Sequence, residues 1–161
     1  FMGAGLNWDV LRLDEVMLWR AEALIQLGEG MDEALNLINQ IRLRAAASTG
    51  RLKFEDGTPT GKFDVQPYRP GVNCPAWTKD FAMQALRWER HLEFSTEGKW
   101  FFDLVRWGIA AEYMNEYFEV EKTRRSYLKD AKFTKNRDEY FPIPQVQISY
   151  VKGLYKQNTG W

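Results

Sequence analysis

Two stretches of helically spaced apolar residues, separated by a very short turn, constrain the fold of this chain most strongly. The first covers residues 11–27. Its predicted buried stripe consists of Leu13, Val16, Met17, Ala21, Leu24 and Leu27. Gly28 and Gly30 follow it, as glycines commonly follow a helix C-terminus. Asp32 and Glu33 come next and suit the positive end of a second helix.

The second stretch runs from there to about residues 47–50. Its predicted buried stripe consists of Met31, Ala34, Leu35, Ile38, Ile41 and Ala45. Two helices joined by so short a turn must pack antiparallel. We therefore predict a helical hairpin over residues 1–50.

Residues 51–77 have no lasting period and are predicted to form a long loop insert, because glycines and prolines interrupt them repeatedly. Loops of this length in compact domains are usually functional or disordered. The insert carries four aromatic residues that we take as candidate ligand contacts, Phe54, Phe63, Tyr68 and Trp77. Such rings can stack on sugar faces, although they can equally fold back and pack against the domain.

Residues 78–161 are predicted to hold further helices and a closing tail. A third helix starts at the N-cap Thr78 and runs to Gly98, with Phe81, Ala85, Trp88 and Leu92 on one face, widened by Ala82 and Leu86. Shorter helices are expected over residues 99–107 and 109–121, then a polar surface segment to residue 139. Pro142 and Pro144 predict an irregular tail. The fold class is mostly α.

Six aromatic residues in and around these helices have helical spacing. They are Trp88, Phe94, Trp100, Phe101, Phe102 and Trp107. We expect them to pack in the core rather than to bind a ligand.

Charge and composition exclude several functions. The 22 basic residues match the 22 acidic ones, so the basic excess typical of nucleic-acid binding is missing. A single His and a single Cys rule out a His/Cys zinc cluster and an internal disulfide, although an all-oxygen cation site stays open. We expect no metal and no cofactor. No apolar run approaches the roughly 18 residues of a membrane span.

The start of the sequence lacks a signal-peptide pattern, and the residues from Phe1 to Gly5 do not resemble a natural beginning. We therefore expect a piece of a longer protein.

A row of charged residues invites an enzymatic interpretation. Glu89, Glu93 and Glu97 are spaced by four, which places them on one face of a helix, and a glycosidase needs a pair of carboxyl groups. The neighbouring charged residues are Arg87, Arg90, Asp103 and Arg106. An arginine beside a carboxyl group lowers its pKa, which is the wrong direction for a general acid. We predict a structural ion-pair network that locks the third helix against the next one, and no catalytic residue.

His91 stands apart from any Ser or Cys in a recognisable nucleophile pattern. We expect it to be a surface or packing residue.

The hairpin resembles a tetratricopeptide repeat, with Ala21, Gly28 and Ala34 at its small-residue positions and one extra residue in the turn. Any tight helical hairpin also needs small residues where its helices cross. A single pair of this kind rarely buries its own faces, so we expect it to leave apolar surface uncovered.

Several segments along the chain together resemble the C-terminal region of the SusD/RagB family, in family order. They are Arg12-Leu13-Asp14-Glu15-Val16, Arg20-Ala21-Glu22-Ala23-Leu24, Ala34-Leu35, Ile38-Asn39-Gln40-Ile41-Arg42, Glu89-Arg90-His91-Leu92-Glu93-Phe94, Glu97-Gly98, Asp103-Leu104-Val105-Arg106-Trp107-Gly108, Tyr140-Phe141-Pro142-Ile143-Pro144 and Gln157-Asn158-Thr159-Gly160-Trp161. The chain departs from the family pattern at Trp100 and Val105, two positions where the family frequently has an Arg.

This resemblance implies a lipid-anchored parent protein on the cell surface of a Bacteroidota-type bacterium. The parent would cover a SusC-like, TonB-dependent outer-membrane transporter and deliver oligosaccharides or, in some members, peptides to it. The family's lipid anchor and much of its ligand surface would precede residue 1, so the resemblance transfers no ligand residue to this chain.

Three candidate functions are consistent with these sequence features. The first is non-catalytic glycan binding and delivery. The second is a helical-repeat scaffold that binds a protein or peptide in a concave face. The third and least favoured is a glycoside hydrolase, which would require two carboxyl groups facing each other across an open cleft free of Arg.

Overall fold

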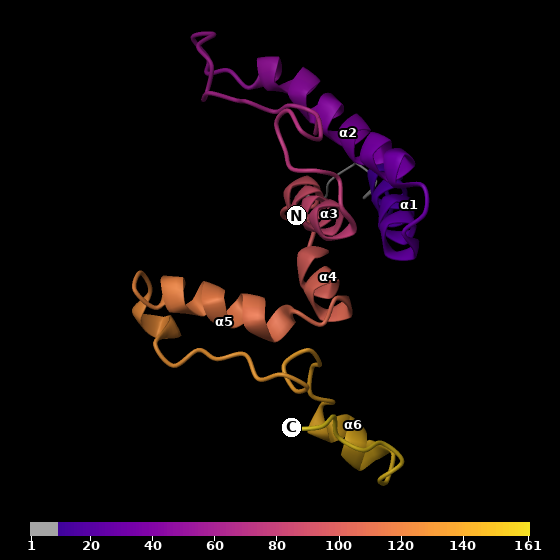
Figure 1. The fold of residues 1–161 in the computed structure, drawn as a ribbon. Helices are drawn as coiled ribbons and strands as arrows, with labels where there is room; N and C mark the ends of the chain where they lie inside the picture. Colours follow the sequence, from indigo (N-terminus) through magenta and orange to yellow (C-terminus); the bar gives the residue numbers. More distant parts are fainter. Residues whose placement is uncertain (1–9) are drawn as a thin grey trace. The chain divides into compact units, whose positions relative to one another are not determined.

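The computed structural model of the chain describes residues 10–161, so the interpretation of the segment from Phe1 to Gly5 lies outside it. The described part is mostly helical and contains no named strand, which confirms the predicted fold class. Its α-helices are α1 (Leu13–Leu27), α2 (Met31–Ser48), α3 (Lys79–Glu93), α4 (Trp100–Arg106), α5 (Ala110–Glu121) and α6 (Gln145–Tyr150). The chain divides into two compact units, the first ending at Phe94 and the second spanning Ser95–Trp161 (Figure 1).

In the first unit α1 and α2 form the predicted tetratricopeptide-like hairpin, and α3 packs against both (Figure 1). Gly28 ends α1 with φ +72°, a left-handed conformation that favours glycine, and its N–H donates to the Ile25 carbonyl oxygen. Across the turn, Arg20 pairs with Glu33 at 2.6 Å. The glycines of the turn therefore have the structural role that the sequence predicts.

The buried face of α1 differs from the predicted stripe. Leu13 and Leu27 are 73% and 71% exposed, whereas Leu18 and Ile25 are fully buried. Helix α1 buries Glu15, Leu18, Ala21, Glu22 and Ile25. The predicted stripe was therefore wrong except near Ala21. Apolar residues lie on two sides of this helix, and the side that packs against the other helices also carries the charged residues Glu15 and Glu22.

The buried face of α2 agrees with the prediction. Ala34, Ile38 and Ile41 are its buried residues, and all three belong to the predicted stripe. They face α1 and α3, the two helices that pack on α2. Leu18, Ile25 and Ile38, each fully buried, belong to the core of this unit.

Helix α3 begins as predicted, since the Thr78 hydroxyl accepts a hydrogen bond from the Phe81 N–H at 3.3 Å. It ends at Glu93 rather than at Gly98. Trp88 is 54% exposed, so its predicted place in the core was wrong, and Leu92 on the same predicted face is 61% exposed. The buried face of α3 consists of Ala82, Met83, Ala85, Leu86, Glu89 and Arg90. Charged residues thus occupy part of the face that the apolar pattern had assigned to Trp88 and Leu92.

The insert is irregular, as predicted, and follows a short 3-10 turn at Thr49–Arg51. Its first part folds into a small turn in which Lys53 and Pro59 form an isolated antiparallel bridge. The chain then returns alongside α2 before it enters α3 (Figure 1).

In the second unit α4 and α5 pack around Leu104, Ala110 and Phe133. Among the six aromatic residues predicted to be core, Phe94 is 1% exposed and Trp100, Phe101 and Trp107 are partly buried. Phe102, in contrast, is 68% exposed, so that prediction was wrong for Phe102 as well as for Trp88. The segment after α5 is largely exposed, but it contributes Phe133 to the core.

The closing tail contains one short helix that the sequence reasoning missed. Helix α6 starts directly after Pro144. A proline suits this position because a helix N-terminus requires no N–H from it and tolerates its fixed φ. The Gln157 side chain holds the tail by donating to the Ile143 carbonyl oxygen and accepting from the Ile143 N–H, both at 2.8 Å.

Candidate functional site

The returning part of the insert is attached to α2 through one asparagine. The Nδ2 of Asn39 donates to the Tyr68 carbonyl oxygen at 3.0 Å, and its Oδ1 accepts from the Tyr68 N–H at 2.7 Å. Both backbone polar groups of Tyr68 are therefore satisfied by one side chain, as a strand neighbour would satisfy them. This fixes the position of residue 68 over the helices.

Arg42, one turn further along α2, makes a second attachment. Its Nε donates to the Gln66 carbonyl oxygen at 2.6 Å, and its Nη1 bonds to the Glu89 carboxylate on α3. The guanidinium carbon also lies 4.3 Å from the centroid of the Tyr68 ring. One arginine thus connects α2, the insert and α3.

Glu89 is buried beneath this arrangement, with a side chain that is 6% exposed. Its Oε1 also accepts a hydrogen bond from the Tyr68 hydroxyl at 3.3 Å. Burial raises the pKa of Glu89 above its ordinary value of 4.5, and the charge of Arg42 opposes this without outweighing it. The expectation that a neighbouring arginine lowers this pKa was therefore wrong in its net direction, because desolvation is the larger effect.

Glu93 makes ion pairs with two arginines from outside the predicted row. Arg12 lies 2.9 Å from its Oε1 and Arg44 lies 2.5 Å from its Oε2. Arg12 also pairs with Asp14 at 2.6 Å. The cations that neutralise Glu89 and Glu93 therefore come mainly from α2 and the start of α1, not from the helix that carries the two glutamates.

The other members of the predicted charged row are Arg87, Arg90, Glu97, Asp103 and Arg106. Glu97 lies beyond the end of α3, so its predicted place on the same helix face was wrong, and it pairs with Lys99 at 3.5 Å. Arg90 is 2% exposed and lies 3.8 Å from Glu15, while Arg87 is a partly buried residue of α3. Within α4, Arg106 pairs with Asp103 at 2.8 Å. That these charges lock α3 against α4 stays a prediction.

The four candidate aromatics separate into two kinds. Tyr68 and Trp77 are partly buried and form a cluster with Phe81, with ring centroids 5.7 to 6.0 Å apart. The indole N–H of Trp77 donates to the Met31 carbonyl oxygen at 3.1 Å. Phe54 and Phe63 are instead 59% and 45% exposed. Exposed rings are available for stacking, whereas the packed pair holds the insert on the helices.

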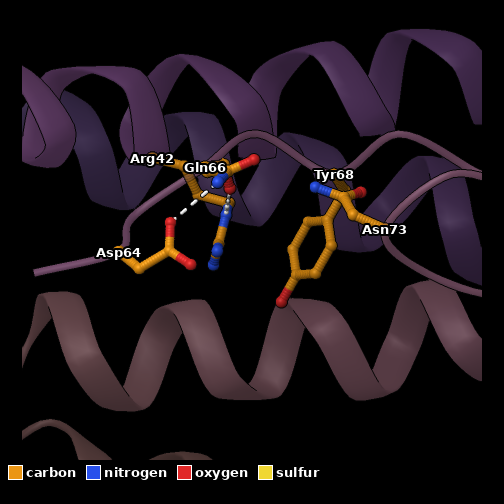
Figure 2. Close-up of a pocket in the computed structure, with 5 residues that line it drawn as sticks. All are labelled: Arg42, Asp64, Gln66, Tyr68 and Asn73. Atoms are coloured by element: carbon orange, nitrogen blue, oxygen red, sulfur yellow. Dashed lines mark hydrogen bonds between the residues drawn. The ribbon is translucent and has the colours of Figure 1, made fainter.

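A pocket of about 210 Å³ opens between the insert and α2 (Figure 2). Its lining is polar and consists of Arg42, Asp64, Gln66, Tyr68 and Asn73. The Tyr68 ring points from the insert toward α3, and the Arg42 guanidinium lies between that ring and the Asp64 carboxylate (Figure 2).

Among the pocket residues, sequence reasoning proposed only Tyr68 as a candidate ligand contact. The missed signal was local: Asn39 and Arg42 lie three apart on α2, and such a pair of polar side chains on one face can bind a neighbouring chain segment. Nothing in the sequence pairs Asn39 with Tyr68, 29 positions away, or Arg42 with Gln66, 24 positions away.

His91 packs against a neighbouring ring, in agreement with the prediction of a surface or packing residue. Its ring lies 5.9 Å from that of Trp88, edge to face, and burial lowers its pKa below 6.5. Across residues 10–161, no three side chains of His, Cys, Asp or Glu gather closely enough to hold a metal ion. None of the helices in this described range is long and apolar enough to cross a membrane.

These features define a mostly helical protein in which a tetratricopeptide-like hairpin supports an anchored, aromatic-bearing insert. The chain belongs to the SusD family, whose pattern matches residues 1–161. It is also similar to the SusD-like protein P2 of Formosa agariphila, with 24% identity over 155 residues. That similarity covers 96% of this chain and 26% of the relative, so the chain spans about a quarter of the relative's length.

Proposed function

We propose that this chain is part of a non-catalytic surface protein that binds oligosaccharides and delivers them to a SusC-like, TonB-dependent outer-membrane transporter. Membership of the SusD family along the whole sequence is the observation that carries this proposal. The proposal includes a lipid anchor and a position at the bacterial cell surface, both properties of the complete protein.

The insert is the part of this chain that we assign to glycan contact. Phe54 and Phe63 present exposed rings, which can stack on the apolar faces of sugars. Tyr68 and Trp77 support them indirectly, because their packing and hydrogen bonds hold the returning segment on α2 and α3. The exposed rings therefore contact the ligand and the packed rings fix the segment that carries them.

The non-catalytic part of the proposal rests on the surroundings of the glutamates. Glu89 and Glu93 lie one turn apart on the same helix, and both carry arginine partners. A glycosidase needs its two carboxyl groups on opposite sides of the scissile bond. The raised pKa of Glu89 would suit a proton donor, but its side chain is almost completely buried beneath Arg42 and Tyr68.

A peptide-binding member of the family, or a helical-repeat scaffold, is the second candidate. The observation that favours it is the apolar surface on α1, where Leu13, Val16 and Leu27 are 73%, 44% and 71% exposed. Uncovered apolar helix faces serve as protein or peptide contacts in helical repeats.

Binding of the chain to an immobilised panel of oligosaccharides and peptides tests these alternatives. We expect oligosaccharide binding that falls at least tenfold in a Phe54→Ala, Phe63→Ala double variant. Phe141→Ala is the matched control, since Phe141 is an exposed phenylalanine in the other unit. Binding of peptides alone would favour the second candidate, and release of shortened sugars during the assay would refute the non-catalytic proposal.

A further inference from the structure

The pocket on the insert has two polar groups that its own structure leaves unused. The Asp64 Oδ1 accepts from the Gln66 side chain at 2.8 Å, which leaves Oδ2 as an acceptor. Arg42 uses Nε and Nη1 for Gln66 and Glu89, and within residues 10–161 its Nη2 makes no hydrogen bond. One acceptor and one donor group thus line the same pocket.

The remaining polar side chains of the pocket are occupied in holding its shape. Gln66 donates to Asp64 and accepts from Arg69 at 3.1 Å. Asn73 donates to the Pro67 carbonyl oxygen at 3.0 Å and accepts from the Arg69 N–H at 2.7 Å. The wall is therefore built before any ligand arrives, which reduces the ordering cost of binding.

The charges of the pocket disfavour an ionic ligand. The guanidinium of Arg42 is already compensated by Glu89, so a bound anion would meet the uncompensated carboxylate of Asp64. A bound cation would meet one exposed carboxylate, and an exposed ion pair contributes little because water screens it. A neutral ligand with several hydroxyl groups meets no repulsion and can use both groups, because each hydroxyl can donate to Asp64 or accept from Arg42.

The size of the pocket limits what it can hold. Its volume of about 210 Å³ lies below the roughly 300–1,000 Å³ typical of sites for drug-sized ligands. A single sugar ring, with neighbouring rings extending into solvent, fits such a space.

We propose that the pocket lined by Arg42, Asp64, Gln66, Tyr68 and Asn73 is a subsite for one uncharged sugar ring, held through adjacent hydroxyl groups by Asp64 as acceptor and Arg42 as donor. This rests on the proposed glycan-binding function and deepens it by assigning a ligand class and two contact residues. It is separate from stacking on Phe54 and Phe63.

The test uses the full chain and three probe sets: neutral hexose and pentose oligosaccharides, uronic-acid oligosaccharides and sulfated oligosaccharides. Asp64 is exposed, so its replacement should leave the fold intact, and Asp64→Ala is expected to weaken binding of the neutral set at least tenfold. Asp64→Asn keeps an acceptor without the charge, so its affinity for the neutral set should lie between the affinities of the wild type and of Asp64→Ala. Glu55→Gln removes an exposed acidic residue of the same insert and should change nothing.

Nuclear magnetic resonance supplies a readout at the pocket itself. The side-chain NH₂ signals of Gln66 and Asn73 are expected to shift on titration with a neutral oligosaccharide that binds. Neutral binding that is lost in the Phe54→Ala, Phe63→Ala variant but unchanged in Asp64→Ala, without shifts at Gln66 or Asn73, would overturn the subsite and leave the proposed function standing. Tighter binding of the charged probes, strengthened by Asp64→Ala, would overturn the ligand class. Absence of binding to all three sets would overturn both proposals.

Discussion

Asn39 and Tyr68, 29 positions apart in the sequence, are joined by a reciprocal pair of hydrogen bonds between a side-chain amide and a peptide backbone. The same arrangement recurs in the second unit, where Asn115 donates to the Phe133 carbonyl oxygen and accepts from the Phe133 N–H, both at 2.9 Å. Gln157 and Ile143 form a third example. In each case a side-chain amide satisfies an irregular segment that has no neighbouring strand.

Replacing Asn39 with Ala should destabilise the first unit by about 1–3 kcal/mol, because two partly buried backbone groups of Tyr68 lose their partner. Urea unfolding measures the loss, and hydrogen exchange of the Tyr68 amide should accelerate. Asn36→Ala, an exposed asparagine on the same helix, serves as the control and should change stability by less than about 0.5 kcal/mol. Equal effects of the two substitutions would contradict the anchoring role.

The raised pKa of Glu89 predicts a pH dependence of stability. Since this pKa is higher in the folded state, the contribution of Glu89 is fully present below its ordinary value of 4.5 and is lost as pH rises through the folded pKa. The free-energy difference between the wild type and Glu89→Gln should therefore favour the wild type more at low pH than at neutral pH. Urea unfolding at several pH values from 4 upward measures it.

Glu116→Gln provides the control for this pH series, because Glu116 is an exposed residue of α5. Its difference from the wild type measures, at each pH, the effect of removing one exposed carboxyl group. A difference for Glu89→Gln that instead grows in favour of the wild type as pH rises would show that Arg42 outweighs burial.

Trp77→Ala should lower stability by about 2–4 kcal/mol, because it removes a partly buried ring from the cluster with Tyr68 and Phe81 and a hydrogen bond to Met31. Phe63→Ala, at an exposed position, should cost less than about 1 kcal/mol. The loss of stability of each variant, measured by thermal unfolding, distinguishes a ring that packs in the fold from a ring that is exposed. Similar losses for both would place Phe63 in the fold rather than on the surface.

Gly160→Ala should destabilise the closing tail for two reasons, the backbone strain of an alanine at positive φ and a steric clash with Arg137. Gly160 has φ +87°, and an added Cβ would lie 2.7 Å from the Cγ of Arg137, whose guanidinium stacks on Trp161 at 4.7 Å. Gly153→Ala is matched in strain, with φ +83°, but its Cβ would meet nothing within 4 Å. We expect the Gly160 variant to be at least about 1 kcal/mol less stable than the Gly153 variant, measured by urea unfolding.

The helices were predictable because their signals are local. The turn at Gly28, the N-cap at Thr78 and the stripe of α2 all depend on residues within a few positions of one another. The packed face of α1 was not predictable in the same way, since Leu18 and Ile25 share it with the charged Glu15 and Glu22. An apolar pattern does not reveal a buried charge whose partner, Arg90, lies on another helix.

The candidate site was predictable only in outline. The Pro- and Gly-rich insert and its aromatic residues were evident, but the pocket depends on contacts from Asn39 and Arg42 to residues 29 and 24 positions away, respectively. Asp64 and Asn73 carry no distinguishing pattern in the sequence. Their role depends on where the returning segment lies, and hydrogen bonds between distant residues determine that position.

The attachment of the insert at Gln66 and Tyr68 has an evolutionary consequence. Residues 52–63 are exposed throughout and lie between the end of α2 and these two anchors, so their side chains contribute little to the core. The entropic cost of a longer loop rises only slowly with its length. Natural variation or laboratory selection can therefore exchange this stretch for others of different length and chemistry while the helices remain stable, which makes it a suitable place for related proteins to diverge in what they recognise.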